Sequence, residues 1–327
     1  MIKLYLAPME ELTGYIFRNA VNRHFGHIDK YFTPFLSPDN RIMKTRSARE
    51  IIPANNEGLY VVPQLLTNDP PQFNDAAKLI CDMGYQEINI NFGCPSNTVA
   101  SKFKGSGILR SPELMDRFLD GVFDKKGSAL SQYPDLRISV KTRVGYNETS
   151  DFEKVLDILD LYPFYEIIIH PRLKKDLYNH KPRMELFRSA CAKLTGDIVY
   201  NGDIFSAADF NALTELFDDP SDGYAGKVTA AMIGRGAIKD PGIFRQIRTD
   251  KAGTKAELFD FLDELYEDYK EVLGTDNAIS KMKEVWSYVT LLIPDEKERM
   301  RVLKTIVSAK GDARYKDAVI VAKGKIR

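Results

Sequence analysis

The sequence has little cysteine, and its three cysteines (Cys81, Cys94 and Cys191) are far apart. Their odd number and wide spacing argue against a disulfide scaffold, and the lack of Cys-x-x-Cys or Cys/His pairs argues against a structural zinc. No apolar run approaches the ~18 residues of a transmembrane helix. The first residues also lack the basic segment and apolar stretch of a signal peptide. We therefore expect a cytoplasmic protein with no membrane and no metal partner.

An excess of either charge sign is also absent. The 327 residues include 46 Lys and Arg and 46 Asp and Glu, so the formal net charge is zero. This balance argues against a uniformly basic surface of the kind that binds nucleic acid. The charges are uneven, however, because residues 255–272 have 2 basic and 7 acidic side chains, whereas residues 299–327 have 9 basic and 2 acidic ones. The basic C-terminal segment is either a solvated face or a local surface that binds phosphates.

Eight short runs rich in β-branched and aromatic residues alternate with helical patterns. The runs predict strands at Leu4–Ala7, Lys30–Phe35, Leu59–Leu65, Glu87–Asn91, Arg137–Lys141, Glu166–His170, Asp197–Tyr200 and Thr229–Ile233. Helical periodicity is clear at Phe73–Gly84, Pro112–Phe123, Asp151–Leu161 and Ala207–Leu216. Eight alternations over the first ~240 residues are typical of a (β/α)8 TIM barrel of the α/β class. A doubly wound open sheet is the alternative.

The strand signal almost disappears after residue 245. From Glu257 to Lys310 the pattern is helical, and Gly274 and Pro294 mark the breaks between three predicted helices. We therefore expect two domains, a TIM-barrel domain at residues 1–245 and a small all-α domain at residues 246–327.

Polar residues follow almost every predicted strand. In a parallel barrel these positions meet at the C-terminal rim, where barrel enzymes carry their chemistry. Amides, cations, one histidine and one thiol would converge there. The candidate site residues at the strand ends are Ala7, Pro8, Met9, Gln64, Asn91, Cys94, Lys141, Arg143, His170, Arg172, Asn201, Asp203, Gly234 and Arg235.

Two glycine turns follow the last two predicted strands, at Gly202 and at Gly234–Gly236. Barrels commonly bind a phosphate at this place, and Arg235 would add a charged contact. Either turn alone is equally compatible with a loop that binds nothing. The GxGxxG fingerprint is absent, which disfavours a tightly bound Rossmann-type NAD.

Lys141 ends a buried strand, where an ammonium needs an anionic or polar partner. A phosphate-bearing cofactor with an electron-rich ring would provide one. Gln64 and Asn91 can each offer a donor and an acceptor to such a ring, or else to loop backbone. His170 is a further candidate, with a structural role at the rim as the alternative.

Cys94 is the sharpest candidate, because it lies between Gly93 and Pro95 in a loop that follows a strand. In that position a thiol can point into the pocket and act as a proton donor or nucleophile. Cys81 and Cys191 lie on predicted helices and are expected to be inert core residues.

The sequence resembles the tRNA-dihydrouridine synthases. The matching blocks cover residues 1 to about 245 and are LAPMEELT, PQLL, NINFGCPS, GSGILRSP, SVKTRVG, IIHPR, YNGDI and IGRGAIKDPGIF. The resemblance implies a TIM barrel that binds FMN and a C-terminal helical domain that helps to bind tRNA. It also implies the reaction, which is reduction of the C5–C6 bond of a uridine in tRNA, with hydride from flavin N5 and a proton from Cys94. NADPH is the implied transient reductant, and we expect a monomer.

The resemblance assigns roles to the other candidate residues. Ala7, Pro8 and Met9 would line the flavin, Gln64 would bond its ring, Lys141 would lie near N1 and O2, and His170 would contact it. Asn201, Asp203, Gly234 and Arg235 would hold the ribityl phosphate end. Asn91 would face the uracil, and Arg143 and Arg172 would lie on the substrate side. One departure is His170-Pro171-Arg172, where many members have His-Gly-Arg, so a contact through that backbone N–H is absent here.

Two other readings compete with this one. The first is an FMN barrel that acts on a small molecule such as dihydroorotate, although such an enzyme keeps its catalytic base in a different loop. The second is an inactive barrel that only binds RNA, against which Cys94, Lys141 and His170 argue.

Overall fold

The structure, a computed structural model, describes residues 2–38, 46–224 and 226–326. The chain divides into two units. We call Met1–Pro8, Asp29–Asp203 and Asn211–Met232 the barrel unit, and Met9–Ile28, Ile204–Phe210 and Ile233–Arg327 the helical unit. The predicted domain boundary at residue 245 stays a prediction. Arg327, the last residue of the basic segment, lies outside the described residues.

The barrel unit is built around a parallel sheet. Within the described residues its strands are β1 (Lys3–Leu6), β2 (Lys30–Phe32), β3 (Val61–Val62), β4 (Gln64–Leu65), β5 (Glu87–Phe92), β6 (Arg137–Arg143), β7 (Ile167–His170), β8 (Ile198–Tyr200) and β9 (Val228–Ile233). They lie in the order β3-β2-β1-β9-β8-β7-β6-β5-β4. The strands from β1 to β3 pair in parallel with their neighbours along the chain, and so do the strands from β4 to β9.

The first and last strands of this order, β3 and β4, are two halves of one run split by Pro63. Val61 pairs with Tyr31 of β2, whereas Gln64 pairs with Asn89 of β5. Proline has no N–H for a ladder, so the run is split at this residue, although Leu65 still bridges to Leu36 in the segment after β2. The sheet therefore closes on itself as eight runs, which confirms the predicted TIM barrel and excludes the open sheet.

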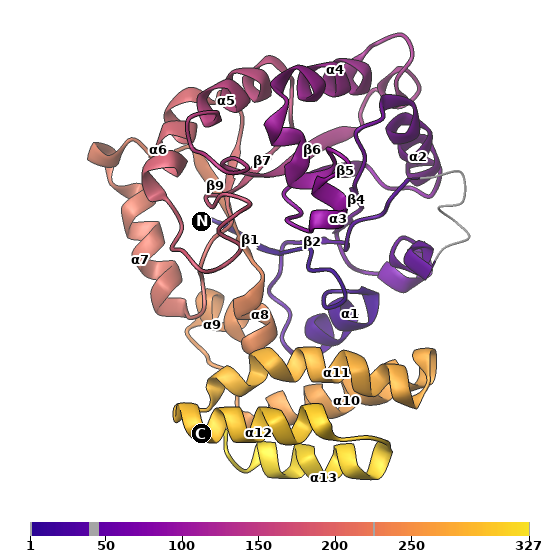
Figure 1. Cartoon of the computed structure of the whole chain (residues 1–327), viewed down its shortest axis with the longest axis vertical. Helices are drawn as coiled ribbons and strands as arrows, with labels where there is room; N and C mark the ends of the chain where they lie inside the picture. Colours follow the sequence, from indigo (N-terminus) through magenta and orange to yellow (C-terminus); the bar gives the residue numbers. More distant parts are fainter. Residues whose placement is uncertain (1, 39–45, 225, 327) are drawn as a thin grey trace. The chain divides into compact units, whose positions relative to one another are not determined.

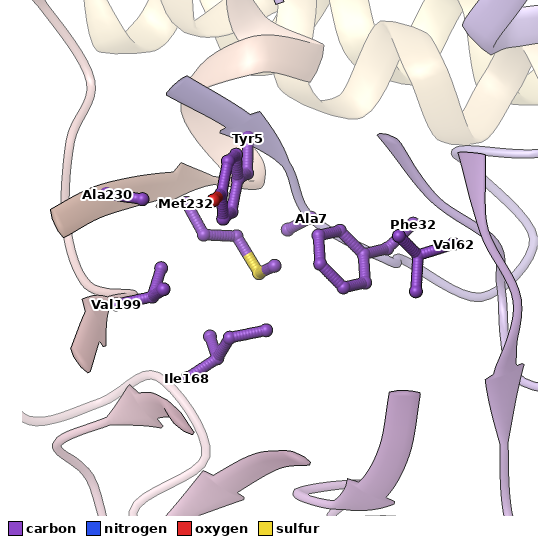
Figure 2. Packing of buried hydrophobic residues seen from close by; sticks show 8 residues of the cluster. All are labelled: Tyr5, Ala7, Phe32, Val62, Ile168, Val199, Ala230 and Met232. Carbon is purple, nitrogen blue, oxygen red and sulfur yellow. The ribbon is translucent and has the colours of Figure 1, made fainter. Parts of the chain in front are cut away.

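The interior of the barrel is filled by side chains from alternate strand positions. Figure 2 shows this cluster, in which Tyr5 and Ala7 of the first run and Ala230 and Met232 of β9 face the same space. Alternation with a period of two places i and i+2 on one face of a strand. The full cluster is Tyr5, Ala7, Phe32, Val62, Ile168, Val199, Ala230 and Met232.

Helices of the barrel unit lie outside the strands (Figure 1). They are α2 (Pro70–Asp82), α3 (Asn97–Ala100), α4 (Pro112–Phe123), α5 (Phe152–Leu161), α6 (Met184–Lys193) and α7 (Ala207–Asp218), whose first turn belongs to the helical unit. The predicted helix Pro112–Phe123 is confirmed with its cap, since the Ser111 hydroxyl accepts from the backbone N–H of Leu114 at 3.4 Å. α2 begins three residues before the prediction, because the Asp69 carboxylate caps it through the N–H of Gln72 at 3.0 Å.

The helical unit contains α1 (Tyr15–His24), α8 (Arg235–Lys239), α9 (Ile243–Thr249), α10 (Lys255–Leu273), α11 (Thr275–Val289), α12 (Glu296–Ser308) and α13 (Asp312–Lys323). The prediction of three C-terminal helices is therefore wrong, because the described residues include a fourth, α13. Ile320 and Val321 of α13 are exposed, which blurs its apolar stripe and hides the helical period. No described helix is both long and apolar enough to cross a bilayer.

The two oppositely charged segments of the sequence pack against each other in part. Lys316 of α13 lies 3.3 Å from Glu267 of α10, and Lys323 lies 2.6 Å from Asp263. The basic residues Lys304, Lys310 and Arg314 are exposed, and no described residue forms an ion pair with them. Only a part of the basic segment therefore remains available for an external anion.

Candidate functional site

Polar side chains of neighbouring strands meet at the C-terminal end of the barrel unit. The strand register pairs Asn91 of β5 with Lys141 of β6, and Arg143 of β6 with His170 of β7. Asn201 directly follows β8, and its Nδ2 donates to the backbone carbonyl of Met232 at 2.8 Å. The predicted convergence at this rim is therefore present within the barrel unit.

The loop after β5 is held by a side-chain amide. Asn91 Oδ1 accepts from the backbone N–H of Gly93 at 3.0 Å and from that of Cys94 at 2.8 Å. Asn91 Nδ2 donates to Gln64 Oε1 at 2.7 Å. This local turn explains why an asparagine stands three residues before Cys94, since its carbonyl can reach both N–H groups.

A second segment fixes the other side of Cys94. The carbonyl of Cys94 accepts from the Ser106 backbone N–H at 3.1 Å and from its hydroxyl at 2.7 Å. These contacts come from the 3-10 helix Gly105–Arg110. Gly105 has a φ of +55°, and a Cβ there would lie 2.9 Å from the Cβ of Cys94. Glycine is therefore required at this close approach.

Cys94 differs from the other two cysteines in its surroundings. It is half-buried, lies in the loop after β5 and forms no disulfide within the described residues. Burial raises the pKa of Cys81, on α2, to about 11 and the pKa of Cys191, on α6, to about 12. Both of those thiols stay protonated at neutral pH, in agreement with the inert role predicted for them.

Lys141 is a cation without a protein acceptor. No described residue accepts a hydrogen bond from its Nζ. Burial, together with a smaller effect of the positive charge of Arg143, lowers the pKa of Lys141 to about 7. An electron-rich or anionic group placed beside this ammonium would reverse that effect. The position therefore suits the N1 and O2 edge of a flavin, although any anion would be favoured there.

Arg143 is buried and its donors are taken up by backbone. Its Nε donates to the carbonyl of Gly93 at 3.1 Å. Its Nη1 donates to the carbonyls of Leu173 at 2.9 Å and Leu177 at 3.3 Å. Arg143 thus ties the Cys94 loop to the loop that follows β7.

Buried Arg172 forms an ion pair with half-buried Asp203 beside His170. The guanidinium of Arg172 donates to both Asp203 oxygens, at 2.9 and 2.5 Å. Arg172 Nη1 also lies 3.1 Å from His170 Nε2. A guanidinium can only donate, so His170 Nε2 accepts and the ring carries its proton on Nδ1. This leaves the protonated side of His170 as a donor.

The remaining predicted residues are divided between the two units. Ala7 is buried in the barrel cluster and Pro8 follows it. Met9, Gly234 and Arg235 belong to the helical unit. There Arg235 lies over the ring of Phe205 at 5.1 Å, and a Cβ on Gly236 would lie 2.0 Å from the carbonyl oxygen of Ile204.

Sequence reasoning missed several residues of the rim. Ser106 and Gly105 hold Cys94, and Asn89 lies beneath Gln64. Tyr178 stacks on His170 with ring centroids 6.0 Å apart. The repeated Asn-x-Asn of NINFGCPS was a usable signal for Asn89, because residues two apart on a strand share a face.

Comparison with known proteins agrees with this geometry. A model of the family described as dihydrouridine synthase (Dus) matches residues 5–320. A tRNA-dihydrouridine(16) synthase of Aquipseudomonas alcaligenes is 24% identical over 306 residues, which cover 90% of this chain and 92% of that protein. A probable tRNA-dihydrouridine synthase of Staphylococcus aureus (strain COL) is 28% identical and covers 79% of this chain and 74% of its own. Morphinone reductase shares the fold, with a TM-score of 0.51 and 11% identity over 76% of this chain and 86% of that one.

Proposed function

The chain belongs to the dihydrouridine synthase family, and we propose that it reduces specific uridines of tRNA to dihydrouridine with bound FMN and a proton from Cys94. The observation that carries the proposal is the rim of the barrel unit. There the loop of Cys94 is fixed by Asn91, and Lys141 lies in register beside Asn91 with no protein acceptor among the described residues. A thiol and an uncompensated cation on adjacent strands suit a reduction that adds a proton to one carbon beside an electron-rich ring.

The residues of the barrel unit that would hold FMN are Ala7, Pro8, Gln64, Lys141, His170, Asn201 and Asp203. The family resemblance gives the same role to Met9, Gly234 and Arg235 of the helical unit. When bound, FMN supplies the hydride that adds to C6 of uracil, and NADPH restores it between turnovers. The fit rests on Lys141, which adjoins Asn91 in the strand register and whose ammonium donates to no described residue.

The chain's own residues then supply the rest of the chemistry. Cys94 gives its thiol proton to C5, so that the C5–C6 double bond becomes a single bond, and the thiolate regains a proton from solvent. Asn91 and Ser106 hold the backbone N–H and carbonyl groups of Cys94. The thiol is therefore already positioned for the proton transfer before the substrate binds. Asn91 faces the uracil in this proposal.

Arg143 and Arg172 act on the substrate side through the loops that they hold. Each donates to protein acceptors, Arg143 to the Cys94 loop and Arg172 to Asp203. Neither guanidinium is therefore an open phosphate clamp. Their contacts support a role in shaping the place where the uracil binds.

The target base has to leave its stack to reach a thiol at the end of a barrel. Base flipping costs a few kcal/mol, which phosphate contacts elsewhere must offset. Lys304, Lys310 and Arg314 of the helical unit are exposed and unpaired within the described chain, so they are the residues we propose for those contacts.

The experiment is reconstitution with unmodified tRNA. The purified protein should show flavin absorbance at about 450 nm. Addition of NADPH should then lead to dihydrouridine formation at defined tRNA positions. Mapping dihydrouridine in tRNA from cells with and without the gene identifies those positions. A protein without flavin, or a flavoprotein that oxidises dihydroorotate and leaves tRNA unchanged, would overturn the proposal.

A further inference from the structure

A row of buried, hydrogen-bonded polar side chains extends from the Cys94 loop toward the opposite end of the barrel. Below Asn91 and Gln64, Gln64 Nε2 donates to Asn89 Oδ1 at 2.7 Å. Asn89 Nδ2 in turn donates to the hydroxyl of Ser139 at 2.9 Å. We call these four residues, Asn91, Gln64, Asn89 and Ser139, the amide relay.

The lower end of the amide relay meets a buried ion cluster. The Ser139 hydroxyl donates to Glu87 Oε1 at 3.2 Å. The ammonium of Lys30 lies 3.1 and 3.0 Å from the two Glu87 oxygens and 2.7 Å from an oxygen of Glu166. The relay therefore spans from a carboxylate at the floor of the barrel to the backbone of Cys94 at its rim.

The groups at both ends of the relay determine which side chains donate and which accept along it. At the rim, backbone N–H groups can only donate, so Asn91 must turn its carbonyl to Gly93 and Cys94. At the floor, both Glu87 oxygens accept from Lys30, so the Ser139 hydroxyl donates and its oxygen accepts from Asn89. Each amide between these ends has one orientation that gives every donor an acceptor. Turning Asn89 over would set its N–H groups against those of Gln64 and its carbonyl against the Ser139 hydroxyl oxygen, whose proton is donated to Glu87.

Water cannot repair a reversed relay. Asn89 and Ser139 are 0% exposed, Gln64 is 1% exposed and Asn91 is 7% exposed. A buried donor or acceptor without a partner is costly, and a fully satisfied polar network specifies one arrangement. The orientation of Gln64 is thus fixed from below by Asn89, whereas that of Asn91 is fixed by the N–H groups of Gly93 and Cys94.

We propose that Asn89 and Ser139 are positioning residues that set the amide orientation of Gln64, so that its carbonyl accepts from Asn91 and supports the loop of Cys94. The importance of that loop rests on the proposed function. Neither residue touches the reacting atoms; each acts through the next member of the relay. The relay needs an acceptor at position 89 for the Gln64 amide. It also needs the Ser139 hydroxyl as an acceptor for the Asn89 amide, because that hydrogen bond fixes the orientation of Asn89.

The test is a set of relay variants of the full-length protein, followed by exchange of the backbone amide hydrogens of Gly93 and Cys94. Ser139→Ala and Asn89→Leu should each speed this exchange about tenfold, which corresponds to about 1.4 kcal/mol. The alkylation rate of Cys94 by iodoacetamide should change in the same variants. Both measurements need neither tRNA nor NADPH.

A carboxylate at position 89 distinguishes an effect of the Asn89 amide orientation from an effect of lost side-chain packing. Asn89→Asp keeps the acceptor for Gln64, so its loop should exchange as in the wild type. In Ser139→Ala/Asn89→Asp either oxygen can accept, so the Ser139 hydroxyl is no longer needed and slow exchange should return. A double variant that stays as fast as Ser139→Ala, or an Asn89→Asp variant that is itself fast, would overturn the assigned roles.

Matched controls remove buried polar groups elsewhere in the barrel unit. Ser128→Ala deletes a buried hydroxyl that caps Leu130, and Asn74→Leu deletes a buried amide that bonds Gly121 and Ala129. Neither belongs to the relay, so both should leave exchange of the Cys94 amide unchanged. Equal acceleration in these controls would show a general loss of stability and overturn the proposal.

One measurement needs no substitution that threatens folding. In wild-type protein labelled with 15N-asparagine, the side-chain N–H groups of Asn89 and Asn91 should exchange slowly. Rapid exchange of both overturns the relay. Absence of dihydrouridine formation with slow exchange would instead contradict the proposed function alone.

Discussion

The barrel unit has a lysine near each end, buried at the floor and half-buried at the rim, and the two differ in their partners. Lys30 at the floor lies within 3.0 Å of Glu87 and 2.7 Å of Glu166, and its ammonium lies over the ring of Tyr5 at 4.8 Å. Lys141 at the rim has no acceptor in the described chain, and burial lowers its pKa to about 7. The floor supplies all the partners its cation needs, whereas the rim lacks one.

This difference separates residues that maintain the fold from residues that await a ligand. A buried charge whose partners all come from the same chain is a structural element, and loss of one partner is strongly destabilising. A lysine ammonium without a partner in a desolvated position has a lowered pKa and tends to lose its proton. Such shifted pKa values are typical of functional sites. We therefore expect rim substitutions to change binding and turnover and floor substitutions to change stability.

The largest effect should follow from Cys94→Ala. We expect dihydrouridine formation to fall by about 10²–10⁴-fold, the usual contribution of a general acid, while FMN stays bound and the melting temperature does not change. Cys81→Ala is the matched control, because Cys81 is also a half-buried thiol but lies on a helix. Normal turnover by Cys94→Ala on unmodified tRNA would remove Cys94 from the mechanism.

The next effect should come from the floor. Lys30→Met leaves two buried carboxylates without their cation, so the free energy of unfolding should fall by about 3–5 kcal/mol in urea titrations. The rate per folded, flavin-loaded molecule should stay near that of the wild type. Replacing Glu87 and Glu166 by glutamine in the same chain should recover part of the loss. Unchanged stability of Lys30→Met would erase the distinction between the two ends.

Lys141→Met should give the opposite signature. FMN affinity, measured by quenching of flavin fluorescence, should fall about tenfold, the effect of losing one charged contact of about 1.4 kcal/mol. The apoprotein should be no less stable than the wild type, since the variant loses a cation that burial disfavours. An apoprotein that unfolds more easily, with unchanged FMN affinity, would make Lys141 a structural residue.

The same lysine predicts a pH dependence. Its folded pKa of about 7 lies below the usual 10.5, so the cost of its burial is fully present below pH 7 and disappears as the pH rises to 10.5. An electron-rich ring raises the pKa again, so FMN binding takes up a proton above pH 7. Wild-type FMN affinity should therefore weaken as the pH rises from about 6 to about 9, and that of Lys141→Met should change less in this range. Parallel curves for the two proteins would contradict this assignment.

The smallest effect should be on the helical unit. Replacing Lys304, Lys310 and Arg314 by glutamate should weaken tRNA binding and flatten its salt dependence by up to about three units of slope, with little change in flavin content. Lys316 and Lys323 are already paired with Glu267 and Asp263, so their replacement by glutamine should flatten the slope less. Equal slopes for wild type and the triple variant would place the tRNA surface elsewhere.

Local patterns predicted the barrel well. The eight strand runs and the capped helix after Ser111 were visible, because β-branched runs, proline at the first helical turn and a serine cap all act within a few residues. The candidate rim residues followed from one rule, that polar residues after parallel strands share an edge. Asn91 and Lys141 are adjacent in register, as that rule requires.

What could not be predicted depends on partners far apart in sequence. Arg172 meets Asp203 across 31 residues, and Lys30 meets Glu166 across 136 residues. No local pattern reports such pairs, so an arginine that holds a loop and an arginine that binds a phosphate look alike in the sequence. The helix α13 was missed for another reason, since exposed Ile320 and Val321 obscure its apolar face.

The break at Pro63 has a consequence for how the barrel comes apart. Around this break, β3 pairs with β2 through two residues and β4 pairs with β5 through two residues, whereas β5 pairs with β6 through six. This run is therefore a natural place for the ring to open first under thermal agitation. Gln64 belongs to this run, so FMN bound against it would be released before the remaining strands separate. Flavin fluorescence should thus rise before secondary structure is lost on heating. The cofactor would then report the opening of the barrel at this run.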